Sequence, residues 1–174
     1  MVSSFWFELE TANQKPETTM KLRFVWIGKT KRTPVKQLIQ EYLGRIDKFA
    51  TVELTELRDR DDVGGDARKI IDKEGEDILS RTASAAYLIA LDERGRELDS
   101  IKLAELIEKH RLVGTKQITF VIGGHCGLSD AVRDRADLVL ALSRMTLTHD
   151  LARVLLIEQV YRAFTIIHDL PYQK

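Results

Sequence analysis

Apolar residues follow two alternating periodicities from residue 20 onward. Short runs of β-branched and aromatic residues predict strands, and apolar positions three or four residues apart predict helices between them. The predicted strands cover residues 22–28, 51–57, 85–91, 118–122 and 138–142. The predicted helices cover residues 33–48, 67–79, 100–111, 129–135 and 148–167. This alternation predicts an α/β domain with a mostly parallel sheet and helices on both faces.

Local signals mark where several of these elements begin or end. Thr33 followed by Pro34 predicts a capped helix start with proline in the first turn. The second strand alternates with period two, so we expect it to lie half exposed at a sheet edge. The charged stretch 92–95 predicts the end of the third strand, and Thr148 or Asp150 is expected to cap the last helix. The apolar surface of that helix is broad enough to contact another subunit as well as the core.

Length and composition indicate one globular domain. The 174 residues can bury one sizeable core, and a balance of 44% hydrophobic and 31% charged residues argues against disorder. No apolar run approaches the roughly 20 residues that a membrane span needs. The single cysteine, Cys126, cannot form an internal disulfide, so a reducing compartment, the cytoplasm, is expected.

The first nineteen residues show no sustained periodicity and end in a polar stretch before Met20. We expect residues 1–19 to be an extension, either disordered or absent from the native protein if translation starts at Met20. The alternative is a short ordered arm that packs on a partner subunit. Residues 20–174 are expected to form the single domain.

A glycine-rich loop follows the fourth predicted strand. Gly123, Gly124 and Gly127 allow backbone to approach a ligand closely, because glycine has no Cβ. His125 and Cys126 lie in the same loop, but no second cysteine pair or His-x-x-x-His spacing accompanies them. We therefore expect no metal site and no thiol chemistry.

Several motifs occur in order along the C-terminal half. They are Leu91-Asp92, Ile122-Gly123-Gly124 with Gly127-Leu128, Ser143-Arg144-Met145-Thr146-Leu147, Arg153-Val154-Leu155, Glu158-Gln159-Val160-Tyr161-Arg162-Ala163 and Pro171-Tyr172. Each is weak alone. Together, and with Asp72-Lys73-Glu74-Gly75, they resemble the RlmH family (ribosomal RNA large subunit methyltransferase H) of the SPOUT methyltransferases over residues 20–174.

The resemblance implies a function and an assembly. Members of this family carry a C-terminal trefoil knot, form homodimers and take the methyl group from S-adenosylmethionine. They methylate N3 of a pseudouridine in 23S ribosomal RNA on the assembled ribosome. Because 27 basic and 27 acidic residues cancel, this chain would have to bind RNA through local basic patches.

The resemblance also assigns candidate donor-binding residues, which lie at the ends of predicted strands or in the loops that follow them. They are Leu91, Gly123, Leu142, Ser143, Arg144, Met145, Thr146 and Leu147, with Gly124 as a secondary candidate. Backbone amides and carbonyls in such loops can form hydrogen bonds with the edge of an adenine, while apolar side chains pack on the faces of the ring. For Leu142, Met145 and Leu147 the alternative is packing in the core.

Catalytic and substrate candidates lie near the C-terminus. Arg162 is expected to stabilise the developing imide anion, together with Glu158 and Tyr172, although Arg162 and Glu158 also have the spacing of a simple helix ion pair. The substrate-binding candidates are Arg153, Gln173 and Lys174. The family usually has histidine where Gln173 stands, and glutamine cannot accept a proton near neutral pH, so the resemblance leaves the general base unassigned.

Two other functions remain open. A non-catalytic RNA-binding or ribosome-associated factor could keep the same fold after losing turnover. A dinucleotide-binding enzyme is the second alternative, but the glycine loop lacks the Gly-x-Gly-x-x-Gly order and comes late in the chain.

Overall fold

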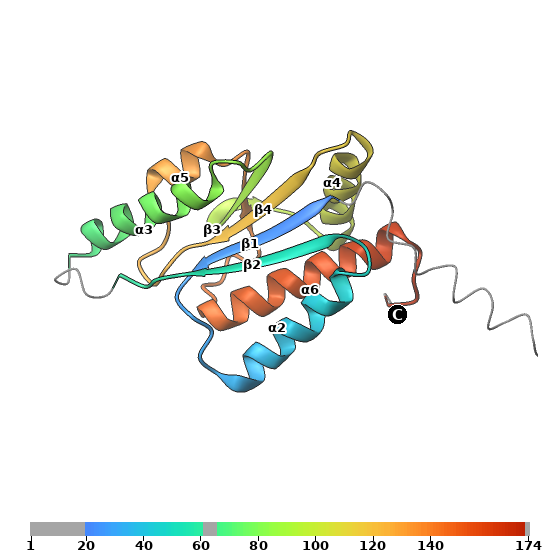
Figure 1. Cartoon of the computed structure of the whole chain (residues 1–174), viewed down its shortest axis with the longest axis horizontal. Helices are drawn as coiled ribbons and strands as arrows, with labels where there is room; N and C mark the ends of the chain where they lie inside the picture. The colour runs from blue at the N-terminus through green and yellow to red at the C-terminus, as the bar shows by residue number, and fades with distance from the viewer. Residues whose placement is uncertain (1–19, 61–65, 173–174) are drawn as a thin grey trace, which may run out of the picture.

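The computed structural model describes residues 20–60 and 66–172. Strands and helices alternate along these residues, as the periodicity predicts (Figure 1). The strands are β1 (Lys21–Ile27), β2 (Thr51–Leu57), β3 (Tyr87–Glu97), β4 (Gln117–Ile122) and β5 (Leu138–Ala141). The helices are α2 (Thr33–Ile46), α3 (Ala67–Thr82), α4 (Ser100–Leu112), α5 (Asp130–Arg135) and α6 (His149–Ile167).

The strands form one sheet in the order β2-β1-β4-β3-β5. Every neighbouring pair is parallel, which confirms the predicted α/β class. Strand β2 lies at one edge, as its period-two pattern predicted, and β5 lies at the other. Because all strands run the same way, the loops that follow them gather at one edge of the sheet.

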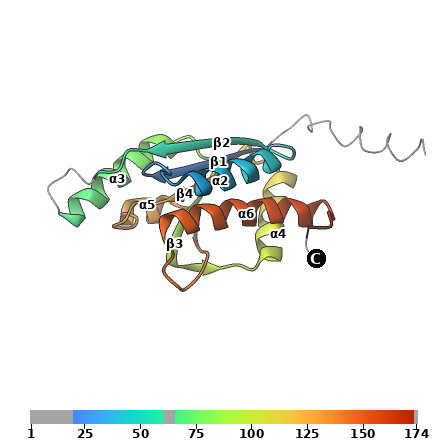
Figure 2. The same cartoon turned by 90° about the horizontal axis from the view of Figure 1, so that it is seen from below.

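Helices cover both faces of the sheet (Figures 1 and 2). Helices α2, α4 and α6 pack on one face over a core that includes Phe24 and Phe120, whose rings stack 5.3 Å apart. Helices α3 and α5 cover the other face, where Val25, Ile78 and Val132 are buried together. Alternate residues of the central strands point into these two cores, so the central strands are apolar on both sides.

Two local predictions were wrong. Strand β3 does not end at Leu91 but continues to Glu97, because Arg96 and Glu97 pair with β5 beyond a register shift. Gly95 permits this close approach, since a Cβ there would lie 2.6 Å from the carbonyl oxygen of Val139. Helix α2 is not capped by Thr33, which is its first helical residue; Arg32 takes the cap position. Thr148 does cap α6, as one of the two expected alternatives.

The described fold does not test three of the expectations, which concern the N-terminal extension, the trefoil knot and the homodimer. Residues 1–19, the predicted extension, are not among the described residues. The trefoil knot and the homodimer stay predictions. None of the described helices has both the length and the apolarity to cross a membrane.

Candidate functional site

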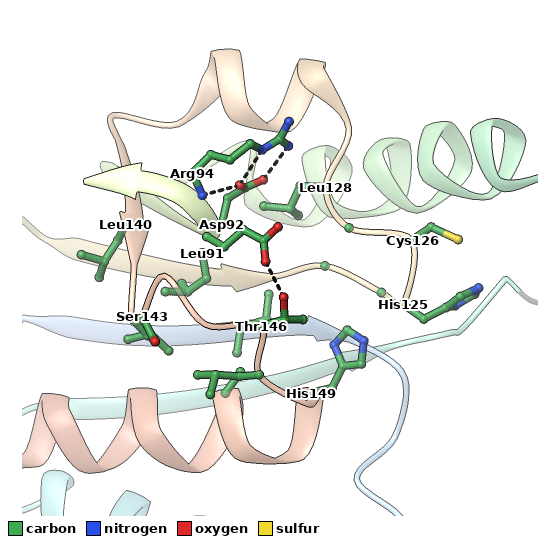
Figure 3. Close-up of a pocket in the computed structure, with 18 of the residues that line it drawn as sticks. Leu91, Asp92, Arg94, His125, Cys126, Leu128, Leu140, Ser143, Thr146 and His149 are labelled. Atoms are coloured by element: carbon green, nitrogen blue, oxygen red, sulfur yellow. Dashed lines mark hydrogen bonds and ion pairs between the residues drawn. The ribbon is translucent and has the colours of Figure 1, made fainter. Parts of the chain in front are cut away.

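A cavity of about 480 Å³ opens at the carboxyl edge of β3, β4 and β5. Ligands in open parallel sheets bind outside this edge, because successive loops can surround them there. Residues 91–94 in the middle of β3, the glycine loop after β4 and the segment after β5 all line it (Figure 3). The apolar side chains in its wall are Leu91, Ile122, Leu128, Leu140, Leu142, Met145 and Leu147.

The glycine loop has a shape that side chains would prevent. The amide of Gly127 donates to the carbonyl of Gly124 at 2.8 Å, and Gly127 has a positive φ of +89°. A Cβ at Gly123 would lie 2.8 Å from the carbonyl oxygen of Gly127, and one at Gly124 would overlap the buried carboxylate of Glu74. These contacts fold the loop tightly and leave its backbone facing the cavity.

The segment after β5 is tied to the unexpected extension of β3. Thr146 Oγ1 donates to Glu93 Oε2 at 3.1 Å (Figure 3). Arg144 donates to the carbonyl of Glu93 at 3.3 Å and pairs with Glu97 at 3.1 Å. The longer β3 therefore supports the wall of the cavity.

Seven of the eight predicted donor-binding residues line this cavity, as does the secondary candidate Gly124. The exception is Arg144, whose guanidinium binds Glu93 and Glu97 instead. Met145 is 77% exposed, so the alternative of core packing does not describe it. The motif residues, far apart in sequence, thus meet at one place.

Asp92 links two walls of the cavity, a role that sequence reasoning did not assign. Its carboxylate accepts from Arg94 at 3.0 Å and from Arg133 at 3.2 Å, and Arg133 also donates to the carbonyl of Leu128 at 2.6 Å. The hydrogen bonds from Arg94, with the charge of Arg133, hold the pKa of Asp92 below its ordinary value despite burial. The side chain is only 8% exposed. Asp92 therefore stays ionised and connects β3 to the end of the glycine loop.

A second cavity, of about 780 Å³, adjoins the first. Both are lined by Gly124, His125 and His149, so these residues form a shared wall. Burial, together with the nearby charge of Arg153, lowers the pKa of His149. His149 is therefore neutral at neutral pH.

Arg153, a predicted substrate-binding residue, is nearly buried in the wall of the second cavity. Its guanidinium donates to the carbonyls of Ile27 at 2.6 Å and Gly28 at 3.1 Å, and to Thr30 Oγ1 at 3.1 Å. It also lies over the ring of Trp26, 5.2 Å from the centroid. These contacts fix the end of β1 against α6.

The catalytic candidates form a separate cluster near the end of α6. Glu158 Oε1 accepts two hydrogen bonds from Arg162, at 2.7 and 3.1 Å, and one from the hydroxyl of Tyr172 at 3.1 Å. The Arg162 guanidinium lies 4.8 Å from the centroid of the Tyr172 ring, and the hydroxyls of Tyr42 and Tyr172 are 3.2 Å apart. Burial, with the neighbouring Tyr42 and Glu158, raises the pKa of Tyr172. Sequence reasoning did not identify Tyr42, because nothing in its helical pattern distinguishes it from a packing residue.

Within one chain this cluster does not reach the first cavity. None of the cluster's residues lines that cavity, and Arg162 lies ten residues after Ala152, the last residue of α6 in the cavity wall, which at about 1.5 Å per residue is roughly 15 Å along the helix. Gln173 and Lys174, the other two substrate candidates, lie outside the described residues. In residues 20–60 and 66–172, no group of three or more His, Cys, Asp or Glu side chains is placed to hold a metal ion.

Known proteins resemble this chain in sequence over most of its length. Residues 20–173 match the family model described as "Predicted SPOUT methyltransferase". The chain is 48% identical over 153 residues to "Ribosomal RNA large subunit methyltransferase H" of Trichlorobacter lovleyi, covering 88% of this chain and 99% of that protein. The protein of the same name from Geobacter sulfurreducens is 45% identical, with the same coverage.

Solved structures share the fold at low sequence identity. A "probable methylase family protein" from Haemophilus influenzae superposes with a TM-score of 0.56 at 14% identity, covering 88% of this chain and 70% of that one. A "Probable Methyltransferase" from Bordetella pertussis gives a TM-score of 0.55 at 13% identity, covering 83% and 96%. The family match and the close relatives show that the chain belongs to the SPOUT methyltransferases, and within them to the family of ribosomal RNA large subunit methyltransferase H.

Proposed function

We propose that the protein methylates N3 of a pseudouridine in 23S ribosomal RNA, with S-adenosylmethionine as the methyl donor. The observation that carries the proposal is the convergence of seven donor-binding candidates around one cavity at the carboxyl edge of the sheet. Its relatives are named as large-subunit ribosomal RNA methyltransferases, and these names supply the substrate class.

The first cavity fits a cationic, adenine-bearing donor in size and in chemistry. Its volume of about 480 Å³ lies within the range of roughly 300–1,000 Å³ that is common for ligand sites. Leu91, Leu142 and Leu147 offer apolar flanks for a ring, and the carboxylate of Glu93, which accepts from the neutral hydroxyl of Thr146, offsets positive charge. When bound, the donor would supply an electrophilic methyl group. The protein has to hold it, orient it and exclude water.

The cluster at the end of α6 provides the catalytic groups of the proposed mechanism. N3 must lose its proton, which passes to solvent water, and be held in line with the methyl carbon. Arg162 stabilises the negative charge that develops on the imide, while Glu158 holds the guanidinium in place. Tyr172, whose raised pKa keeps its proton, supplies a hydrogen-bond donor and an aromatic face for a base.

A homodimer brings this cluster to a donor cavity. In one chain no residue of the cluster lines the cavity, so we propose that the cluster of one protomer completes the site of its partner. Exposed apolar side chains near the start of α6 support contact with a second protomer, since Leu151 is 59% exposed and Met145 is 77% exposed. The trefoil knot belongs to this proposal. We also propose that Gln173 and Lys174, with Arg153, lie on the RNA side of the site. A cytoplasmic location beside the ribosome is part of the same proposal.

The two alternative functions are less well supported. Family membership argues against a dinucleotide-binding enzyme. An RNA-binding factor without turnover is less favoured because the named relatives are methyltransferases.

The deciding experiment is methyl transfer from labelled S-adenosylmethionine to ribosomes that lack the modification, with mass spectrometry of the RNA. N3-methylpseudouridine in 23S RNA would support the proposal and show that Gln173 is tolerated. Donor binding without methylated RNA would favour the non-catalytic factor instead.

A further inference from the structure

Three exposed cations line the second cavity without a carboxylate partner. Lys29, Lys31 and Arg32 all belong to the loop that joins β1 to α2. Across residues 20–60 and 66–172, no ion pair or side-chain hydrogen bond involves any of the three. A surface charge without a partner keeps its full attraction for an external anion, so this loop has positive charge available for binding.

The carboxylates of the same cavity are largely engaged by the protein. Glu56 Oε1 accepts from the amide and hydroxyl of Thr30, both at 2.8 Å, and from Trp26 Nε1 at 3.2 Å. Asp150 lies 3.8 Å from the guanidinium of Arg153. Asp59 also lines the cavity, beside Gly28. The three unpaired cations therefore dominate the charge that the cavity presents to a ligand.

Helix α2 adds to this positive potential. It begins at Thr33, directly after Arg32, and its first turn contains no acidic residue. Among the described residues, no side chain caps its first amides. The amino end of a helix carries a partial positive charge, and uncapped amides there favour an anion.

The second cavity also adjoins the donor cavity. The shared wall of Gly124, His125 and His149 separates the cations from the place where the methyl donor is proposed to bind. The whole molecule has no net charge, so affinity for RNA has to come from a local patch at the site of reaction.

We propose that the second cavity is a phosphate-binding subsite, in which Lys29, Lys31 and Arg32 hold the RNA backbone next to the target nucleotide. The inference rests on the proposed function and extends it by assigning residues to substrate positioning. Contacts to phosphate fix the register of a nucleic acid without reading its sequence. The role of the loop would therefore be to place the target base at the shared wall.

The test compares two variants that lose the same amount of charge. In the first, Lys29, Lys31 and Arg32 are all changed to Gln. The control changes Lys48, Lys109 and Lys116 to Gln. These three lysines are also exposed and lie toward the opposite edge of the sheet: Lys48 follows α2, Lys109 lies in the last turn of α4 and Lys116 precedes β4. Methyl transfer to ribosomes lacking the modification is measured over a series of salt concentrations, with donor binding measured separately.

We expect the first variant to raise the KM for ribosomes by about tenfold or more at 0.1 M salt. The slope of log KM against log salt should fall by about two to three, since each phosphate contact contributes roughly 0.7 to 0.9. Donor affinity and kcat should stay within about twofold of wild type, and the control variant should match wild type.

An unchanged KM and salt slope in the first variant would overturn the inference, as would an equal loss in the control. Inhibition of the wild type, but not of the first variant, by millimolar inorganic phosphate at constant ionic strength would support the inference, because phosphate would then compete with the RNA backbone for the subsite. Binding of phosphate to the subsite without any effect on methylation would overturn it. Failure of the proposed function is a different result, because wild type itself would then methylate no ribosomal RNA.

Discussion

The hydroxyl of Tyr172 donates a hydrogen bond of 3.1 Å to Glu158 Oε1, the oxygen that also accepts both hydrogen bonds from Arg162. One carboxylate oxygen thus holds an aromatic side chain and a guanidinium in a fixed relation. The Tyr172 ring makes an edge contact with Tyr161, with centroids 4.9 Å apart. The chain end is therefore docked on α6 up to Tyr172.

Removing this hydroxyl tests whether the cluster is catalytic or structural. Tyr172→Phe keeps the ring contacts and loses the hydrogen bond, so the free energy of unfolding should fall by only about 0.5–1.5 kcal/mol. A catalytic role predicts a fall in kcat of about tenfold or more with donor affinity unchanged. Tyr42→Phe is the matched control, because it removes the neighbouring hydroxyl that does not contact Glu158 directly. If kcat of Tyr172→Phe equals that of wild type, Tyr172 acts only in packing.

Mixing two inactive variants tests the composite site. Gly124→Ala should lose the donor cavity and Arg162→Ala should lose the catalytic cluster, so each homodimer should be nearly inactive. A heterodimer of the two has one intact site, made from the cavity of one protomer and the cluster of the other. Activity should therefore recover after the variants are unfolded and refolded together, as measured by methyl transfer to ribosomes. If the mixture stays inactive while light scattering shows dimers, the site lies within one chain.

The glycine loop makes a sharp prediction about donor binding. A methyl group at Gly124 would overlap the buried carboxylate of Glu74, so Gly124→Ala should displace the loop and weaken donor binding by about tenfold or more. The control is Gly44→Ala on α2, where a Cβ has nothing within 4 Å. That change should raise the free energy of unfolding by about 0.5–1 kcal/mol, because alanine is the better helix former. Calorimetric titration with S-adenosylmethionine measures the first effect and urea unfolding the second.

Arg153 should contribute to stability through its planar guanidinium. Arg153→Lys keeps the charge, but a single ammonium group cannot donate at once to the carbonyls of Ile27 and Gly28 and to the hydroxyl of Thr30, as the planar guanidinium does. We expect the free energy of unfolding to fall by about 2–3 kcal/mol, since buried acceptors lose their donors. Arg111→Lys, in a partly exposed pair with Glu108, should change it by less than about 0.5 kcal/mol. Equal effects of the two changes in urea unfolding would contradict this role for Arg153.

Stability should depend on pH through His149. Burial lowers its pKa in the folded protein, so between that pKa and the ordinary value near 6.5 the unfolded chain binds more protons. Stability is therefore greatest above about pH 6.5 and falls as the pH drops toward the folded pKa. His149→Asn should flatten this dependence in urea unfolding between pH 5 and 8, and an unchanged slope would show that other groups cause it.

Local sequence pattern predicted the elements well, because hydrophobic periodicity reflects which face of each element is buried. It failed at the charged stretch 92–95, whose composition predicts the end of a strand although the stretch lies inside β3. There the pairing of Arg96 and Glu97 with β5 outweighs the polar composition. It also placed the cap of α2 one residue late, since Thr33 offers a hydroxyl that the chain does not use as a cap.

The sequence by itself determined the α/β class, the glycine loop and, through its motifs, the family and most of the donor-site residues. Tertiary structure alone decided that Arg144 turns toward Glu93 and Glu97, that Asp92 joins two walls of the cavity, and that a second cavity adjoins the first. It also placed the Glu158 cluster further along α6, outside the wall of the donor cavity. The physical reason is that periodicity records the burial of each residue, whereas these contacts depend on which loops the parallel sheet brings to the same edge.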